Sequence, residues 1–148
     1  MKYYFELVVN DFSIFEKEGN PIYYGKKCRN LLMRDSYKIY SGSNNTVEAI
    51  AKEKAWLFWS DYEVIIEKYK ILGHLRFPKG TILLDFPNEK FLFKRKLGSF
   101  FLNEVQMGQS EVWEHSLNHY LSRVEITDFN YLLYFVIILI ANIDLVVM

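Results

Sequence analysis

The sequence predicts a mainly β protein, a closed antiparallel barrel of about twelve strands around a central hydrophobic C-terminal helix. The first observation is composition: 18% of the 148 residues are aromatic, and Tyr and Phe recur in short runs with Val and Ile, as is typical of strands. The second is the run Tyr131–Ala141, which contains no charged or amide side chain. We expect one domain over residues 1–148, with strands over residues 3–126 and the helix over residues 128–143.

Successive strand–turn–strand units predict the antiparallel order, because two short apolar runs joined by turn residues form a hairpin. The units are Tyr37–Tyr40 with Val47–Ala51, Tyr62–Glu67 with Ile71–Phe77, Ile82–Phe86 with Phe91–Phe93, and Phe100–Leu102 with Val112–His115. In the last unit the break is expected around Met107–Gln109. A sheet of this many strands tends to curl and close, so the hairpins predict a barrel.

The stretch Asn45–Trp59 has two interpretations. Asn45 and Glu48 stand at the spacing of a helix capping box, and the apolar residues that follow fit one helical face. Val47, Ala49 and Ala51 instead alternate as in a strand, and strand patterns flank them on both sides. The alternation favours a strand, with a helix as the alternative.

The C-terminal helix is expected to follow Thr127 and Asp128, which offer N-cap side chains. The run Tyr131–Ala141 is too long for a half-exposed strand and shorter than the about 20 residues that span a bilayer. A helix that is apolar on every side must be enclosed by protein, and the lumen of a barrel of about twelve strands is wide enough to hold it. Two alternatives remain: a tail anchor, if residues 145–148 extend the segment, and a barrel that carries a small apolar ligand.

Several stretches resemble the tubby C-terminal-like superfamily, and within it the LURP-one-related and small bacterial tubby-like proteins. They are Phe12–Tyr23, Asp35–Tyr40, Asp61–Ile65 and His119–Ile126, followed by the apolar helix and Asp144. The resemblance spans nearly the whole chain and implies a twelve-stranded barrel around a central helix. It also implies kinship with phospholipid scramblases and with tubby domains that bind phosphoinositides. This chain departs from those binders because its 18 basic and 18 acidic side chains leave no net charge.

Two lysine clusters are the candidate sites for an anion or a lipid headgroup. In a strand that continues from Lys90 to residue 97, Lys90, Lys94 and Lys96 share one face, opposite to the phenylalanines. Lys26 and Lys27 form a second, weaker cluster. If both clusters lie on one side of the barrel, they form a headgroup site. The alternative is that these lysines only protect a solvated strand edge.

The other reactive side chains form no catalytic or metal motif, so we expect no enzyme activity and no cofactor. They are His115 and His119 at a spacing of four, the lone Cys28, and the aromatic group Trp56, Phe58 and Trp59. The histidine pair lies in strand and turn patterns, and the aromatic group is expected in the core. Cys28 is expected to be a buried or half-buried thiol; the alternative is a reactive thiol whose pKa is lowered by Lys26, Lys27 and Arg29.

These observations predict a non-enzymatic binding module that contacts anionic phospholipid or a protein partner. Zero net charge argues against nucleic acid as a partner. The single cysteine and the charged first residues, without a signal-peptide core, predict a cytoplasmic protein, peripheral to the membrane if it binds lipid. The oligomeric state is not predicted.

Overall fold

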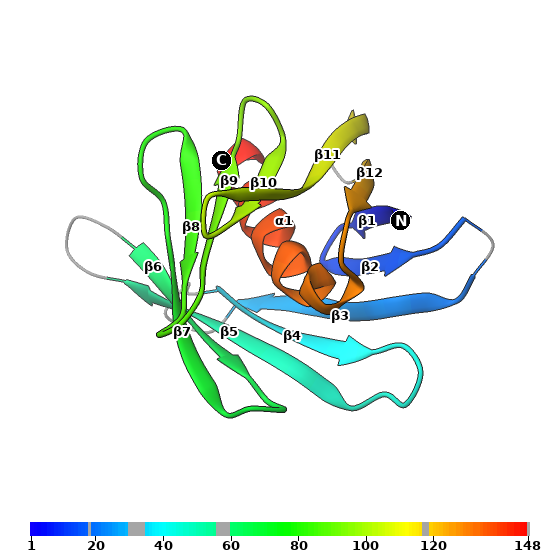
Figure 1. The fold of residues 1–148 in the computed structure, drawn as a ribbon. Coiled ribbons are helices and arrows are strands. Elements are labelled where there is room, and N and C mark those ends of the chain that lie inside the picture. The colour runs from blue at the N-terminus through cyan, green and yellow to red at the C-terminus, as the bar shows by residue number, and fades with distance from the viewer. Residues whose placement is uncertain (18, 30–34, 56–59, 117–118, 148) are drawn as a thin grey trace.

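Twelve antiparallel strands close into a barrel in the computed structural model of this chain (Figure 1). The structure describes residues 1–17, 19–29, 35–55, 60–116 and 119–147. The strands are β1 (Lys2–Val8), β2 (Asp11–Phe15), β3 (Pro21–Arg29), β4 (Asp35–Ser41), β5 (Val47–Ala55), β6 (Ser60–Ile66), β7 (Ile71–Arg76), β8 (Thr81–Asp85), β9 (Lys90–Lys94), β10 (Ser99–Leu102), β11 (Val105–Ser116) and β12 (His119–Ile126). Each strand pairs with the next along the chain, which confirms the predicted meander.

The barrel closes where the first strand meets the last. β1 pairs with β12 from Lys2 opposite Glu125 to Val8 opposite His119, and its other edge pairs with β2. Closure leaves the sheet with no edge strand for a second chain to extend, which is a recurrent protection against aggregation.

Side chains alternate between the lumen and the outer wall because the β pleat has a period of two. In β9, Phe91 and Phe93 are buried while Lys90 and Lys94 are exposed. β8 and β12 repeat the alternation. The inward residues are mostly large aromatic and aliphatic side chains, so the wall itself supplies most of the buried core residues.

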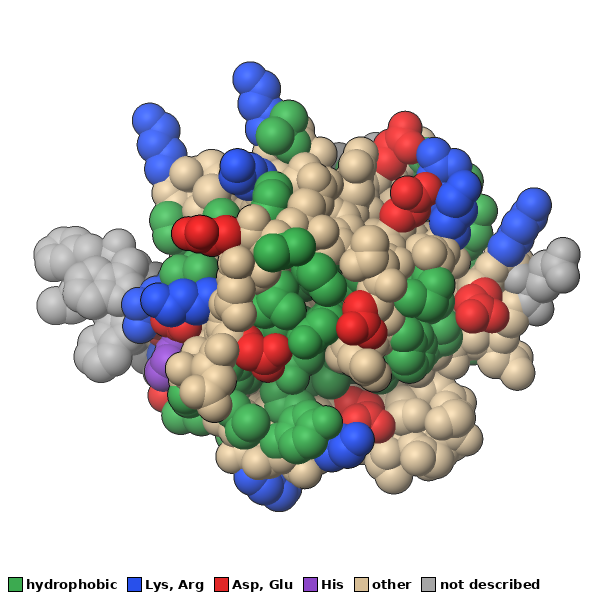
Figure 2. Space-filling view, in the orientation of Figure 1, with side chains coloured by type: hydrophobic (Ala, Val, Ile, Leu, Met, Phe, Trp, Pro, Cys, Tyr) green, Lys and Arg blue, Asp and Glu red, His purple; other side chains and the backbone are tan. Residues whose placement is uncertain are grey.

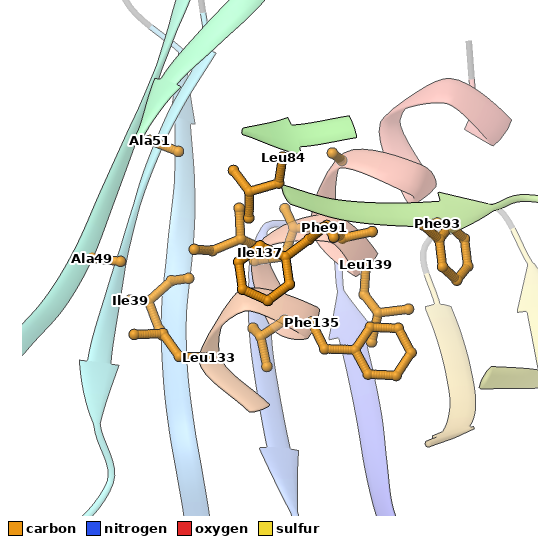
Figure 3. Close-up of a cluster of buried hydrophobic side chains, with 14 of the residues drawn as sticks. Ile39, Ala49, Ala51, Leu84, Phe91, Phe93, Leu133, Phe135, Ile137 and Leu139 are labelled. Atoms are coloured by element: carbon orange, nitrogen blue, oxygen red, sulfur yellow. The ribbon is translucent and has the colours of Figure 1, made fainter. Parts of the chain in front are cut away.

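The lumen is filled by α1 (Leu132–Val147), which follows the short 3-10 helix η1 (Phe129–Tyr131). Asp128 caps η1: its carboxylate accepts a hydrogen bond from the backbone N–H of Asn130 at 2.9 Å. Five consecutive side chains of α1, from Phe135 to Leu139, have no exposed surface. Figure 3 shows side chains of α1 directed toward those of β4, β5, β8 and β9. The enclosed helix that the sequence predicts is therefore present.

One polar contact fixes α1 within the barrel. The hydroxyl of Tyr37, a fully buried side chain of β4, donates to the carbonyl oxygen of Ile137 at 3.3 Å. Burial of each large apolar side chain of the helix contributes about 1.5–3 kcal/mol, so α1 is a dominant source of stability.

The predicted break around Met107–Gln109 is wrong. The turn lies at Asn103 and Glu104, where both residues have positive φ (47° and 73°). β11 then continues as one strand through Gly108, with Met107 as the extra residue of a β-bulge opposite β10. Gly108 serves close packing: a Cβ at this position would lie 2.5 Å from the carbonyl oxygen of Glu125 and 3.3 Å from the ring of Phe135. Glycine is required there because a strand and the core helix approach the same point.

Two further expectations can be compared with the structure. Val47–Ala55 is the strand β5, so the helical alternative fails over that range, whereas Trp56, Phe58 and Trp59 lie outside the described residues. Among the described residues, no helix has both the length and the apolarity needed to cross a membrane.

Candidate functional site on the outer wall

A groove of about 500 Å³ lies on the outer wall of the barrel, across β8, β9 and β10. It is lined by Leu83, Lys90, Leu92, Lys94, Phe101, Asn103 and Glu104. Two of the predicted site residues, Lys90 and Lys94, are therefore part of one surface feature. We call it the outer groove.

The floor of the outer groove is a row of three apolar side chains on three neighbouring strands. Leu83 of β8 stands opposite Leu92 of β9, which stands opposite Phe101 of β10. Directly opposed side chains on one face of a sheet are close enough to touch. All three are half-buried although they point away from the lumen. This row has the composition of a binding surface, with apolar atoms at its centre and charges at its margins.

Lys90 and Lys94 flank this floor, each two residues from Leu92 along β9. Four residues of strand separate their Cα atoms by roughly 13 Å. The ammonium nitrogen of Lys94 lies 5.0 Å from the centre of the Phe101 ring, a cation–π distance. Neither ammonium forms an ion pair with any residue that the structure describes. The two charges are therefore available to an anion that contacts the apolar floor.

The β10–β11 turn holds one end of the groove in place. The side-chain oxygen of Asn103 accepts a hydrogen bond from the backbone N–H of Lys90 at 3.1 Å, and the backbone N–H of Asn103 donates to the carbonyl oxygen of Lys90 at 2.9 Å. Glu104, next to it, places one carboxylate at this end. An anionic group is consequently favoured at the Lys94 end, away from Glu104.

Lys96 does not share the face of Lys90 and Lys94, contrary to the prediction. β9 ends at Lys94, and residues 95–98 form a turn closed by Gly98, whose φ is +68°. Arg95 in that turn donates from Nε to the side-chain oxygen of Asn142 in α1 at 3.0 Å. The strand alternation assumed for residues 95–97 is thus replaced by a turn that contacts the end of the helix.

The second lysine cluster lies on the opposite side of the barrel. In the closed strand order, β3 is six strands from β9 in either direction. Lys27 also faces Asp35, with its Nζ 3.3 Å from a carboxylate oxygen, and the Nε of Arg29 lies 2.9 Å from the other oxygen. Lys26 is exposed on β3. The structure therefore does not bring Lys26 and Lys27 together with Lys90 and Lys94.

Asp35 shows how strongly these cations are engaged. Burial raises the pKa of its carboxyl, but the hydrogen bond from Arg29 and the charge of Lys27 outweigh burial, so the pKa is lowered from its ordinary value of 3.8. The Asp35 carboxylate thus engages both Lys27 and Arg29 and offsets one of their two charges.

Of the histidines and the cysteine singled out in the sequence, none whose side chain is described lines the outer groove. Among the described residues, no three His, Cys, Asp or Glu side chains meet as metal ligands. His119 instead contacts Glu6 across β1 and β12, with its Nε2 2.8 Å from the carboxylate, and the side chain of His115 lies outside the description. Cys28 is an exposed free thiol.

Comparison with known proteins does not assign the chain to a family. No protein-family model matches it, and neither the curated proteins nor the solved structures contain a significant match.

Proposed function

We propose that this protein is a non-enzymatic binding module that uses the outer groove to contact the headgroups of anionic phospholipids at a membrane surface. The observation that carries the proposal is the pair Lys90 and Lys94, exposed and without ion pairs among described residues, on either side of a half-buried apolar row. A phosphate or carboxylate would pair with the lysines, while the glycerol and upper acyl region would contact Leu92 and Phe101. The protein would then be cytoplasmic and peripheral to the membrane.

The charge balance favours a local contact over general attraction. The chain has no net charge, so no global field draws it to a bilayer. Each lysine near an anionic surface contributes about 1 kcal/mol, so two lysines and the apolar floor give weak, reversible binding. Such a module binds the membrane transiently, and salt releases it because ions screen the attraction between the lysines and the anionic headgroups.

We further propose that the chain belongs to the tubby C-terminal-like superfamily, closest to the LURP-one-related and small bacterial tubby-like proteins. The twelve-stranded antiparallel barrel with a helix in its lumen is the fold that this resemblance implies. The same filled lumen weakens the alternative of an apolar-ligand carrier, because α1 occupies the space that a cargo would need. Native mass spectrometry that finds an apolar molecule retained by the purified protein would favour the carrier.

Vesicle flotation tests the lipid proposal. We expect greater recovery with vesicles of phosphatidylcholine and phosphatidylserine than with vesicles of phosphatidylcholine alone. Replacing Lys90 and Lys94 together by Gln should remove about 2 kcal/mol, roughly a 30-fold loss in partitioning. The single variants Lys90→Gln and Lys94→Gln should each lose more than Lys26→Gln, the matched control, which removes one charge on the opposite wall.

Equal recovery with both kinds of vesicle, or with neither, would remove the lipid proposal. A double variant that floats as well as the Lys26→Gln control would place the contact elsewhere. If an acidic peptide binds the wild-type protein in a salt-sensitive manner while anionic vesicles do not, the partner is a protein.

A further inference from the structure

A second concave site lies at the end of the barrel where α1 begins, far from the outer groove. It has a volume of about 540 Å³, within the range of small-molecule sites. Its lining residues are Asn20, Pro21, Ile22, Tyr23, Ser41, Gly42, Ser43, Glu48 and Phe129. We call it the mouth pocket. It is formed by β3, β4, β5 and η1, whereas the outer groove is formed by β8, β9 and β10.

Two β-bulges build the mouth pocket. In β3, Tyr23 pairs with Ile14 and Pro21 with Phe15, which leaves Ile22 as an extra residue. In β5, Ala49 and Val47 pair with consecutive residues of β4, which leaves Glu48 as an extra residue. A bulge redirects a side chain out of the regular alternation, and bulges recur beside functional sites. Both extra residues line the pocket.

The β4–β5 turn closes the pocket between the two bulges. The backbone N–H of Gly42 donates to the carbonyl oxygen of Ile22 at 2.8 Å. A Cβ at Gly42 would lie 1.6 Å from the carbonyl oxygen of Pro21, so only glycine permits this approach of two backbones. The pocket wall is thus fixed by main chain at this side and does not depend on flexible side chains.

Glu48 is the charged group of the mouth pocket. Its carboxylate forms no hydrogen bond or ion pair with any residue that the structure describes. Glu67, whose backbone N–H donates to the carbonyl oxygen of Glu48 at 2.9 Å, faces it across β5 and β6 and is neutralised by Lys70. Lys70 pairs with Glu67 and not with Glu48, so the Glu48 carboxylate has no counter-charge among the described residues and favours a cation.

The aromatic walls and the surrounding field also favour a cation. Tyr23 and Phe129 line the pocket, and Phe129 is 43% exposed. Burial first, and then the negative charge of Glu48, raise the pKa of Tyr23 to about 12, so its hydroxyl stays protonated. Figure 2 shows hydrophobic side chains in the middle of the face that it draws, with both acidic and basic side chains around them.

We infer that the mouth pocket binds a small organic ammonium ion, with its charge beside Glu48 and its alkyl groups against the rings of Tyr23 and Phe129. A carboxylate supplies the counter-charge, and aromatic faces attract alkylammonium groups at low desolvation cost. The hydroxyls of Ser41 and Ser43, 2.9 Å apart, can accept hydrogen bonds from a polar tail of the ligand. This inference does not depend on the outer groove or on lipid binding.

Choline chloride is the probe, and 3,3-dimethyl-1-butanol is its neutral counterpart of the same shape. In a ¹H–¹⁵N NMR titration we expect saturable shifts at residues 20, 22, 23, 41–43 and 48 with choline. The neutral alcohol should bind at least about tenfold more weakly, since it lacks the charge that pairs with Glu48. Dihexanoylphosphatidylcholine carries the same ammonium group on a short-chain lipid. Comparing its affinity with that of choline shows whether the pocket prefers a free or a lipid-borne ammonium. Saturable shifts at the same residues with either compound support the inference.

Glu48→Gln should weaken choline binding about tenfold or more, because it removes the counter-charge and keeps the shape. Glu104→Gln, a carboxylate in the β10–β11 turn, is the matched control and should bind as the wild type does. A readout without ligand is the titration of the Tyr23 phenol, followed by the NMR signals of its ring: because the charge of Glu48 helps to raise the pKa of Tyr23, this pKa should be lower in Glu48→Gln than in the wild type.

Three results would overturn the inference: no saturable shift with choline, equal affinity for choline and the neutral alcohol, or unchanged affinity in Glu48→Gln. The Lys90 and Lys94 variants should bind choline normally. Failure at one site is therefore distinguishable from failure at the other.

Discussion

Removing one ring from α1 tests whether the helix is the core of the barrel. Phe135 has no exposed surface, and its ring stacks on Phe100 with 4.3 Å between centroids and 11° between planes. Phe93 lies 6.0 Å from the same ring on another side. Phe→Ala changes in cores cost about 3–5 kcal/mol, and the stacked pair places Phe135→Ala in the upper half of that range. We expect a loss of about 4–5 kcal/mol in the free energy of unfolding.

Urea unfolding followed by circular dichroism measures this loss directly. For a chain of this size each kcal/mol corresponds to about 2–4 °C, so the melting temperature should fall by roughly 8–20 °C. Leu97→Ala is the control: Leu97 is 65% exposed in the β9–β10 turn, and its truncation should cost about 0.5 kcal/mol or less.

The cavity left by Phe135→Ala gives a second readout. An apolar cavity of this kind stays dry and binds benzene, so benzene should raise the melting temperature of the variant and leave the wild type unchanged. If Phe135→Ala costs no more than Leu97→Ala and benzene has no effect, the helix is not enclosed by the barrel and the account of the fold is refuted.

Three further changes test other parts of the structure. Gly42→Ala should cost about 1–3 kcal/mol in urea unfolding, because its Cβ would meet the carbonyl oxygen of Pro21 at 1.6 Å; wild-type stability would contradict the close approach. The pKa of Asp35 is lowered in the folded protein, so its ion pairs stabilise the protein above pH ~4. This stability is lost as the pH falls through the pKa of Asp35 in the folded state. The urea midpoint should therefore drop less on acidification in Asp35→Asn than in the wild type. Val9 has a φ of 59°, a conformation that strains a β-branched residue. Val9→Gly should therefore raise the free energy of unfolding by up to about 1 kcal/mol. A lower melting temperature in this variant would disprove the strain.

The fold was accessible from the sequence because its main signals are local. The two-residue alternation of β8 and β9 and the uncharged run from Tyr131 each reflect the environment of consecutive side chains. Gly108 was assigned to a turn because a glycine that permits a turn and a glycine that permits close packing look alike in one sequence. The Asn103–Glu104 turn carries a weaker signal, since only Asn is common at positive φ.

The sites were less accessible because they depend on pairing between strands. Lys90 and Lys94 were named from the alternation of one strand, but the apolar row beside them exists only in the register of three strands. The lysine clusters of β3 and β9 lie on opposite sides of the barrel because of the meander order alone. This separation therefore follows from the predicted strand order without coordinates. The bulge at Glu48 has no sequence signature, so the mouth pocket could not have been found without coordinates.

The position of α1 after all twelve strands has a consequence for biosynthesis. While the ribosome makes the chain, the strands emerge before the helix that gives them a common interior, and β1 must wait for β12, its partner across the seam. During that interval the unclosed sheet presents free backbone groups and uncovered aromatic side chains, the surfaces through which nascent chains associate. A holding chaperone should therefore matter most until α1 has left the ribosome and packed in the lumen.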